Sequence, residues 1–358
     1  MTCFFDVGCY VLLTENKLVG ILKPIDPTEP LQPRCMRNMV GLLLCWRVIR
    51  LREIKQFSTI DEQLNILKER GLIIDDIDEA HRVLSYISYY RLSAYTLTLR
   101  CNDQFYEDVH FSDVLQIYDF DMEMRAALMH LLESIEVSMR TYIGYHHAKA
   151  FGALGYHDEK TFEDKARFKK FEEDYKKSIK EYGEKEAFVK HHNDVYGGQF
   201  PIWVLVEILT LGTLSRLFKN LTPELKSEIC STHYGLINES YIGNWLQGCT
   251  ILRNICAHRG RLFNRHIPFS IKLSNKDKQL FKNKDIEIDK ANKQLFVYLI
   301  VIRKMVPNNK VWDTFADKLI ELVKKYPFVR LDYYGFTDDW KKVLGIKDNR
   351  KESGARHH

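Results

Sequence analysis

The feature that most constrains the fold is an apolar stripe that continues from Ser112 to Ala150. Its members recur at helical spacings and are Leu115, Tyr118, Met122, Leu128, Leu131, Ile135 and Tyr142. A stripe with this period predicts an amphipathic helix. It is the longest helix that we expect in the chain.

Shorter helices are predicted on both sides of this stripe. Thr59 and Glu62 form a capping box before a helix that ends at Gly71. The other predicted helices span Asp78–Leu99, Lys160–His192, Pro201–Phe218, Pro223–Ser231, Ser240–His258, Asp289–Met305 and Lys310–Tyr326. Residues 101–110 are expected to form a loop, and strand patterns are nearly absent. The sequence therefore predicts an all-α fold.

Composition narrows the class of protein without naming a function. The chain has 358 residues and a mild net charge of +5, which is compatible with an RNA partner. Its eight cysteines are scattered without a C-x-x-C pair, so we predict no metal site and no cofactor. Scattered cysteines favour a reducing, cytoplasmic location. The longest apolar run, Met39–Trp46, is too short to span a membrane.

Residues 1–50 differ in composition from the rest. They hold four of the eight cysteines and four of the nine prolines, and Asp26–Pro33 has the composition of a linker. We expect an N-terminal extension with little fold of its own, poorly ordered or translated from a misassigned start. A chain that begins near Leu51 is expected to keep its solubility and activity.

The chemistry of the chain concentrates in Cys249–Arg265, which reads CTILRNICAHRGRLFNR. Asn254 and His258 are four residues apart and share a helix face. Arg253 lies about 140° around the axis from His258, so the two meet only if the arginine leans over or the helix frays near its end. An imidazole exchanges protons near neutral pH and a guanidinium binds phosphate. Together these groups suit the cleavage of RNA.

The spacing of Arg253 and His258 is weak evidence by itself. The same spacing occurs at Arg125 and His130, and again at Arg261 and His266. The plain alternative is a basic helix end with a capping histidine. What distinguishes Arg253 is its setting, with a polar neighbour and a basic tail of Arg259, Arg261 and Arg265.

Two other groups have a structural and a functional interpretation. Glu133, Glu136 and Arg140 share a face of the long helix, where they form either a local ion-pair ladder or supports that orient the site. Four tyrosines, Tyr86, Tyr89, Tyr90 and Tyr95, either pack in the core with bonded hydroxyls or stack on bases. We favour the structural interpretation in both cases.

The stretch LRNICAHRGRLFNR resembles the Arg-polar-x3-His signature of the HEPN superfamily. More narrowly, it resembles the Abi family of abortive-infection proteins, the AbiD- and AbiF-like group. Three further stretches are similar to that family: SYISYYRLSAY (85–95), FPIWVLVEILTLGTLSRLFKNL (200–221) and YGFTDDW (334–340). The resemblance covers about residues 53 to 345.

The resemblance implies a HEPN-type helical bundle at residues 111–305. An N-terminal helical segment would occupy residues 51–110, a C-terminal one residues 306–345, and a disordered tail residues 346–358. It also implies a metal-independent endoribonuclease used in phage defence. Such proteins are generally dimers with facing motifs.

On this hypothesis RNA is the substrate, and His258 acts as general base or general acid. Arg253 stabilises the transition state, and Asn254 orients the histidine or binds phosphate. Arg259, Arg261 and Arg265 hold the RNA backbone. The rival hypothesis is a non-catalytic helical module that binds RNA or a partner. A third is a toxin silenced by a neutralising RNA or protein partner.

Overall fold

The computed structural model describes residues 10–14, 17–22, 54, 56–183, 185–235, 237–281 and 288–346. These residues divide into two units after Gln63. The first contains an antiparallel pair of strands, β1 (Tyr10–Thr14) and β2 (Lys17–Leu22), and the start of α1 (Ile60–Glu69). The rest of the predicted extension and residues 347–358 of the predicted tail lie outside the described residues.

The second unit confirms the all-α prediction, since its only strands are the short pair β3 and β4 within the part of the chain that is described. Its elements are α2 (Ile77–Tyr86), α3 (Tyr89–Ser93), β3 (Arg100–Cys101), β4 (Gln104–Phe105), α4 (Phe111–Phe151), α5 (Lys165–Tyr182), α6 (Ala187–Val195), α7 (Ile202–Leu205), α8 (Leu211–Asn220), α9 (Pro223–Tyr234), α10 (Glu239–Ala257), α11 (Asn275–Gln279), α12 (Ile288–Ala291), α13 (Leu295–Met305), α14 (Asn309–Lys325) and α15 (Trp340–Val343). Short 3-10 turns connect several of them, including η2 (Gly155–His157), η3 (Glu159–Thr161), η4 (Val206–Ile208) and η5 (Leu331–Tyr334).

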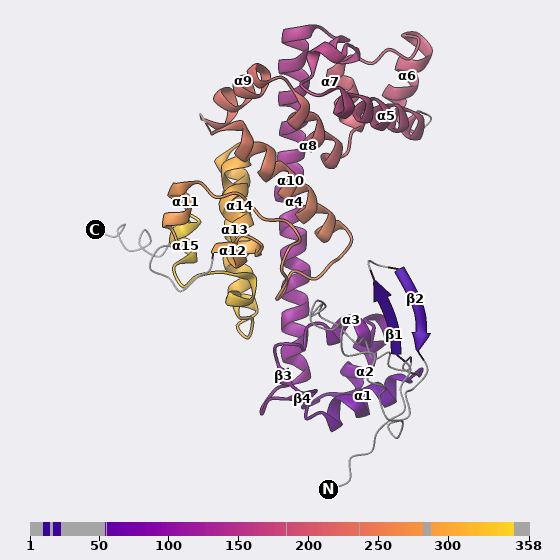
Figure 1. Ribbon diagram of the computed structural model, residues 1–358. Coiled ribbons are helices and arrows are strands. Elements are labelled where there is room, and N and C mark those ends of the chain that lie inside the picture. Colours follow the sequence, from indigo (N-terminus) through magenta and orange to yellow (C-terminus); the bar gives the residue numbers. More distant parts are fainter. Residues whose placement is uncertain are drawn as a thin grey trace, which may run out of the picture. The chain divides into compact units, whose positions relative to one another are not determined.

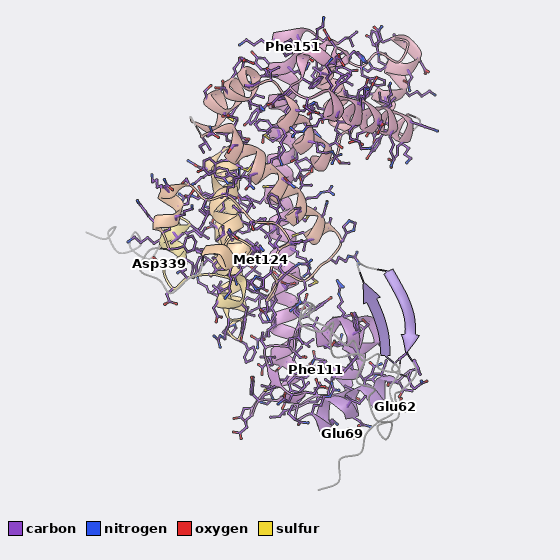
Figure 2. The ribbon with its side chains drawn as sticks, viewed as in Figure 1. Glu62, Glu69, Phe111, Met124, Phe151 and Asp339 are labelled. Atoms are coloured by element: carbon purple, nitrogen blue, oxygen red, sulfur yellow. The ribbon has the colours of Figure 1, made fainter. Side chains whose placement is uncertain are left out.

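The long helix predicted from the apolar stripe is α4, which runs from Phe111 to Phe151. At about 1.5 Å per residue its length is roughly 60 Å. Helices α7, α8, α9, α10 and α14 contact it at different heights, as Figure 1 shows. Figure 2 labels its two ends and, between them, Met124. Met124 is fully buried whereas Met122, which the predicted stripe included, is 46% exposed.

The predicted helix Asp78–Leu99 is wrong, because the chain breaks at Ile87 and Ser88. Ile87 is extended, and the hydroxyl of Ser88 accepts a hydrogen bond from the backbone N–H of Arg91. A serine that binds a nearby backbone N–H competes with the helical pattern and starts a new helix. The result is two short helices, α2 and α3, in place of one.

The predicted helix Pro201–Phe218 is also broken. Its first part ends with η4, and Thr210 then caps α8 by accepting from the N–H of Thr213 at 3.2 Å. Arg140 of α4 donates to the carbonyls of Val206 and Leu209 at 3.1 Å each. The break therefore exposes carbonyl groups that an arginine of α4 satisfies.

Two more predicted helices are each divided. Lys160–His192 becomes α5 and α6, and Asp289–Met305 becomes α12 and α13. Residues 101–110, predicted as a loop, contain most of the β3–β4 hairpin, which begins at Arg100. Its turn residues Asn102 and Asp103 both have positive φ, which suits a two-residue hairpin turn.

Several local predictions are confirmed. The backbone N–H of Thr59 donates to the carboxylate of Glu62, and the N–H of Glu62 donates to the threonine hydroxyl. Helices α9, α10 and α14 lie within a few residues of their predicted bounds. No helix in the described part of the chain is both long enough and apolar enough to cross a membrane.

Candidate functional site

The helix that carries the Arg253 motif, α10, ends in a Schellman cap. The N–H of Gly260 donates to the carbonyl of Ile255 at 2.8 Å, and that of Arg259 donates to the carbonyl of Cys256 at 3.0 Å. His258 is the C-cap residue, and its own N–H donates to the carbonyl of Asn254. This pair of hydrogen bonds satisfies carbonyls that the helix end leaves open. The imidazole of His258 is thereby placed at a fixed turn, not on a frayed end.

Arg253 leans away from the helix end, toward α4. Its Nε lies 3.9 Å from Oε2 of Glu136, and its Nη1 donates to Oδ1 of Asn254 at 3.5 Å. Glu136 is buried and accepts from Arg140 at 2.6 Å. A buried carboxylate therefore lies between two guanidinium groups, one from its own helix and one from α10. The side chain of Arg253 remains 39% exposed.

The three predicted supports on α4 thus differ in position. Glu136 and Arg140 form an ion pair that also reaches the motif, which is more than a local ladder. Glu133 is exposed and does not join that pair. Arg140 is fixed in turn by the two carbonyls at the break before α8. Glu136 therefore lies between Arg253 of α10 and Arg140 of its own helix.

The two polar motif residues closest to the helix end are open to solvent. Asn254 and His258 are both exposed, four residues apart on one face of α10. Between them lies Cys256, which is buried, and burial raises the pKa of its thiol to about 12. A neutral buried thiol is neither a nucleophile nor a metal ligand. The reactive groups of this helix end are therefore the imidazole, the amide and the guanidinium.

Helix α3 packs its polar side next to the motif. Nη2 of Arg91 donates to the carbonyl of Arg259 at 2.7 Å. Its neighbour Tyr90 is 87% exposed and Tyr86 is also exposed, so the core interpretation is wrong for these two tyrosines. Tyr95 is buried with a bonded hydroxyl, as predicted. The exposed rings remain available for stacking on bases.

Two of the three arginines in the basic tail donate hydrogen bonds to groups within the protein. Arg261 donates to the carbonyl of Ala94 at 3.0 Å, and Arg265 donates to the carbonyl of Arg261 at 3.2 Å. Both side chains are half-buried, whereas Arg259 is exposed. Arg259 is thus the member of the tail with the most open guanidinium.

A buried network that the sequence did not indicate holds the chain after the motif. The carboxylate of Asp121 accepts from the N–H groups of Leu262 and Phe263 at 3.1 and 2.8 Å. Tyr95 and Tyr334 donate their hydroxyls to it at 2.8 and 3.0 Å. Arg125 donates to the same carboxylate. In the sequence, Asp121 and Arg125 are four residues apart and share a face of α4, but Asp119 and Glu123 nearby give no sign that this pair is the buried one.

Arg259 has a left-handed backbone, with φ of +56°, which costs a residue with a Cβ about 1 kcal/mol or more. We expect Arg259→Gly to leave the free energy of unfolding unchanged or raise it by up to about 1 kcal/mol. Arg259→Ala is the matched control, since it removes the same charge and keeps the strain. Urea unfolding of both variants would check this, and equal loss of stability in the two would contradict it.

The fold and this helix end define an all-helical protein with an exposed histidine, amide and guanidinium on one helix terminus. The sequence profile of the Abi-like protein family matches residues 82–264, just over half of the 358 residues. The chain belongs to this family. The matched span includes the motif and α3, but not the 334–340 stretch. No curated protein and no solved structure matches the chain.

Proposed function

We propose that the protein is a metal-independent endoribonuclease of the HEPN superfamily, in its AbiD- and AbiF-like group. Its family suggests a role in abortive infection. The observation that carries the nuclease proposal is the exposure of Asn254 and His258, together with the partly exposed guanidinium of Arg253 that donates to this asparagine. The buried Glu136 behind that guanidinium supports its orientation.

The proposed reaction uses the RNA's own 2′-hydroxyl as nucleophile. One imidazole takes the 2′-OH proton while the 2′-oxygen bonds to phosphorus. The bond from phosphorus to the 5′-oxygen breaks, and a second imidazole gives that oxygen a proton. Arg253 donates to the phosphoryl oxygens, where charge increases in the transition state. The products end in a 2′,3′-cyclic phosphate and a 5′-hydroxyl.

A homodimer is part of the proposal, because one histidine does not easily perform both proton transfers in one turnover. Two copies with facing α10 ends would supply two imidazoles and two guanidinium groups. Arg259 is proposed to bind the RNA backbone, with Arg261 and Arg265 fixing the loop that carries it. A neutralising RNA or protein partner would then cover the same surface.

The test is incubation of the purified protein with single-stranded RNA in EDTA. Because the proposed roles need only imidazole and guanidinium, cleavage should persist, and a 2′-deoxy nucleotide at the cut should abolish it. The rate should pass through a maximum with pH, because one imidazole must be neutral while the other is protonated. Light scattering should show a dimer. A divalent-ion requirement, or equal cleavage of the deoxy substrate, would contradict this mechanism. Binding without cleavage would favour the non-catalytic module.

A further inference from the structure

A second cationic site lies away from the end of α10. Helices α5 and α8 pack side by side, as Figure 1 shows, and a cavity of about 200 Å³ opens between them. We name it the α5–α8 pocket. Four cations and a carboxylate line it, together with a phenylalanine and a threonine. They are Arg167, Lys170, Arg216, Lys219, Asp174, Phe171 and Thr213.

The carboxylate of this pocket is already paired, which leaves two cations without a counterion. Asp174 accepts from Arg216 at 2.6 Å and lies 3.5 Å from Lys170. Lys219 donates only to a neutral group, the amide oxygen of Gln247. Among the described residues, no carboxylate lies within ion-pair distance of Arg167 or Lys219. The pocket therefore holds positive charge that an anion from outside would neutralise.

Packing holds the side chain of Lys219 in place, and its surroundings disfavour its charge. Its stem packs over Gly243 of α10, where a Cβ would lie 3.5 Å from the lysine Cγ. Burial lowers the pKa of Lys219, and so do the charges of Arg167 and Lys272. Of these cations Arg167 and Lys219 line the pocket, and two cations that repel each other gain free energy when a phosphate binds between them. The volume is below the roughly 300 Å³ of pockets that take a drug-sized ligand, which suits a phosphate group.

The pocket is aligned with the motif along α10. Gln247, Thr250, Asn254 and His258 follow one another at spacings of three and four residues, so they share one face of the helix. Thr250 faces α8, since a Cβ on Gly212 would lie 3.4 Å from its Cγ2. Gln247, which accepts from Lys219, precedes His258 by eleven residues. This corresponds to about 16 Å along the helix axis. An extended strand spans such a distance with a few nucleotides.

We propose that the α5–α8 pocket is a phosphate subsite for single-stranded RNA, and that it binds a backbone phosphate a few nucleotides from the scissile bond. This inference rests on the proposed function, which it extends by defining the path of the substrate. The strand runs from the pocket past the exposed side chain of Asn254 to His258. Arg167 and Lys219 supply the charge-assisted donors at its far end.

The binding test uses the full chain with His258→Ala, so that RNA is not cut. Lys219→Gln and Arg167→Gln should each weaken binding of a labelled single-stranded oligoribonucleotide about fivefold. Each should also lower the slope of log affinity against log salt by about 0.7. The matched control is Lys169→Gln, which removes the same charge from α5 on the face opposite the pocket. Because Lys219 is repelled by its neighbours, Lys219→Gln should not lower the melting temperature.

The cleavage test separates a subsite from a general effect of charge. A dinucleoside monophosphate has only the scissile phosphate, so wild type and Lys219→Gln should cut it at equal rates. A longer RNA should be cut about fivefold more slowly by the variant, through KM. Equal defects on both substrates, or binding like that of Lys169→Gln, would overturn the subsite.

Failure of the proposed function would look different. If wild type cuts no RNA but Lys219→Gln still weakens RNA binding, the pocket binds RNA phosphate and the nuclease proposal fails. If cleavage is intact and Lys219→Gln changes nothing, only the subsite fails. Saturable binding of ATP that Lys219→Gln abolishes, with RNA binding unchanged, would assign the pocket to a free phosphorylated ligand and overturn the proposal.

Discussion

His258→Ala is expected to lower the rate of RNA cleavage by about 10²- to 10⁴-fold, the usual contribution of a positioned acid or base. The fold should not change, because the side chain is exposed and the helix is capped by the backbone N–H groups of residues 258–260. Cleavage of a labelled RNA and thermal melting would measure the two effects. Expression of wild type should slow bacterial growth, and the variant should not.

The matched control is His266→Ala. His266 is exposed and follows Arg261 at the same spacing by which His258 follows Arg253, so it has the same pattern in a different setting. We expect nearly wild-type cleavage from it. If both histidine variants lose activity equally, or if His258→Ala stays fully active and toxic, the catalytic assignment of His258 is wrong.

The structure gives a physical reason why one of three similar Arg-x4-His pairs stands out. Arg125 is buried and donates to Asp121. Arg261 is half-buried and donates to a carbonyl. Arg253 has an exposed guanidinium with a carboxylate behind it. Spacing alone could not separate these cases, because the difference lies in what each arginine contacts. Arg125 meets a carboxylate of its own helix, Arg261 a backbone carbonyl, and Arg253 a carboxylate of another helix.

The sequence predicted best what is decided locally. The stripe that became α4 and the capping box at Thr59 depend on residues within a turn or two of each other. The breaks at Ser88 and Thr210 were missed, although both are side chains that bind a nearby backbone N–H. The apolar residues around them recur at helical spacing without a break. This spacing alone does not show where a side-chain cap ends one helix and starts another.

What could not be predicted is the pairing of distant residues. Glu136 and Arg253 lie on different helices, and only the packing of α10 on α4 brings them together. The four donors that meet Asp121 from outside α4 come from three separate parts of the chain. One of them, Tyr334, belongs to the YGFTDDW stretch. Its role there is structural, since it closes the network from the C-terminal side.

The largest effect on stability is expected from Asp121→Asn. The carboxylate is fully buried and paired with Arg125, and removal of one charge from a buried pair costs about 3–5 kcal/mol. Asparagine has a single acceptor oxygen, so it cannot satisfy all the donors that now surround the carboxylate. Urea unfolding would measure the loss. Tyr334→Phe is the control, since it removes one hydrogen bond of the same network and should cost only about 1 kcal/mol.

The same substitution tests how the motif is held. Leu262 and Phe263 donate to Asp121 two and three residues after Gly260, so a weaker network should loosen the segment that carries Arg259 and Arg261. At a temperature where Asp121→Asn remains folded, RNA binding should fall, while binding by Tyr334→Phe stays near wild type. A loss of stability below about 1 kcal/mol would show that Arg125 is satisfied elsewhere and that the network is not the support of the site. A large loss of stability with unchanged binding would show instead that the segment keeps its conformation through the Schellman cap and the hydrogen bond from Arg91 alone.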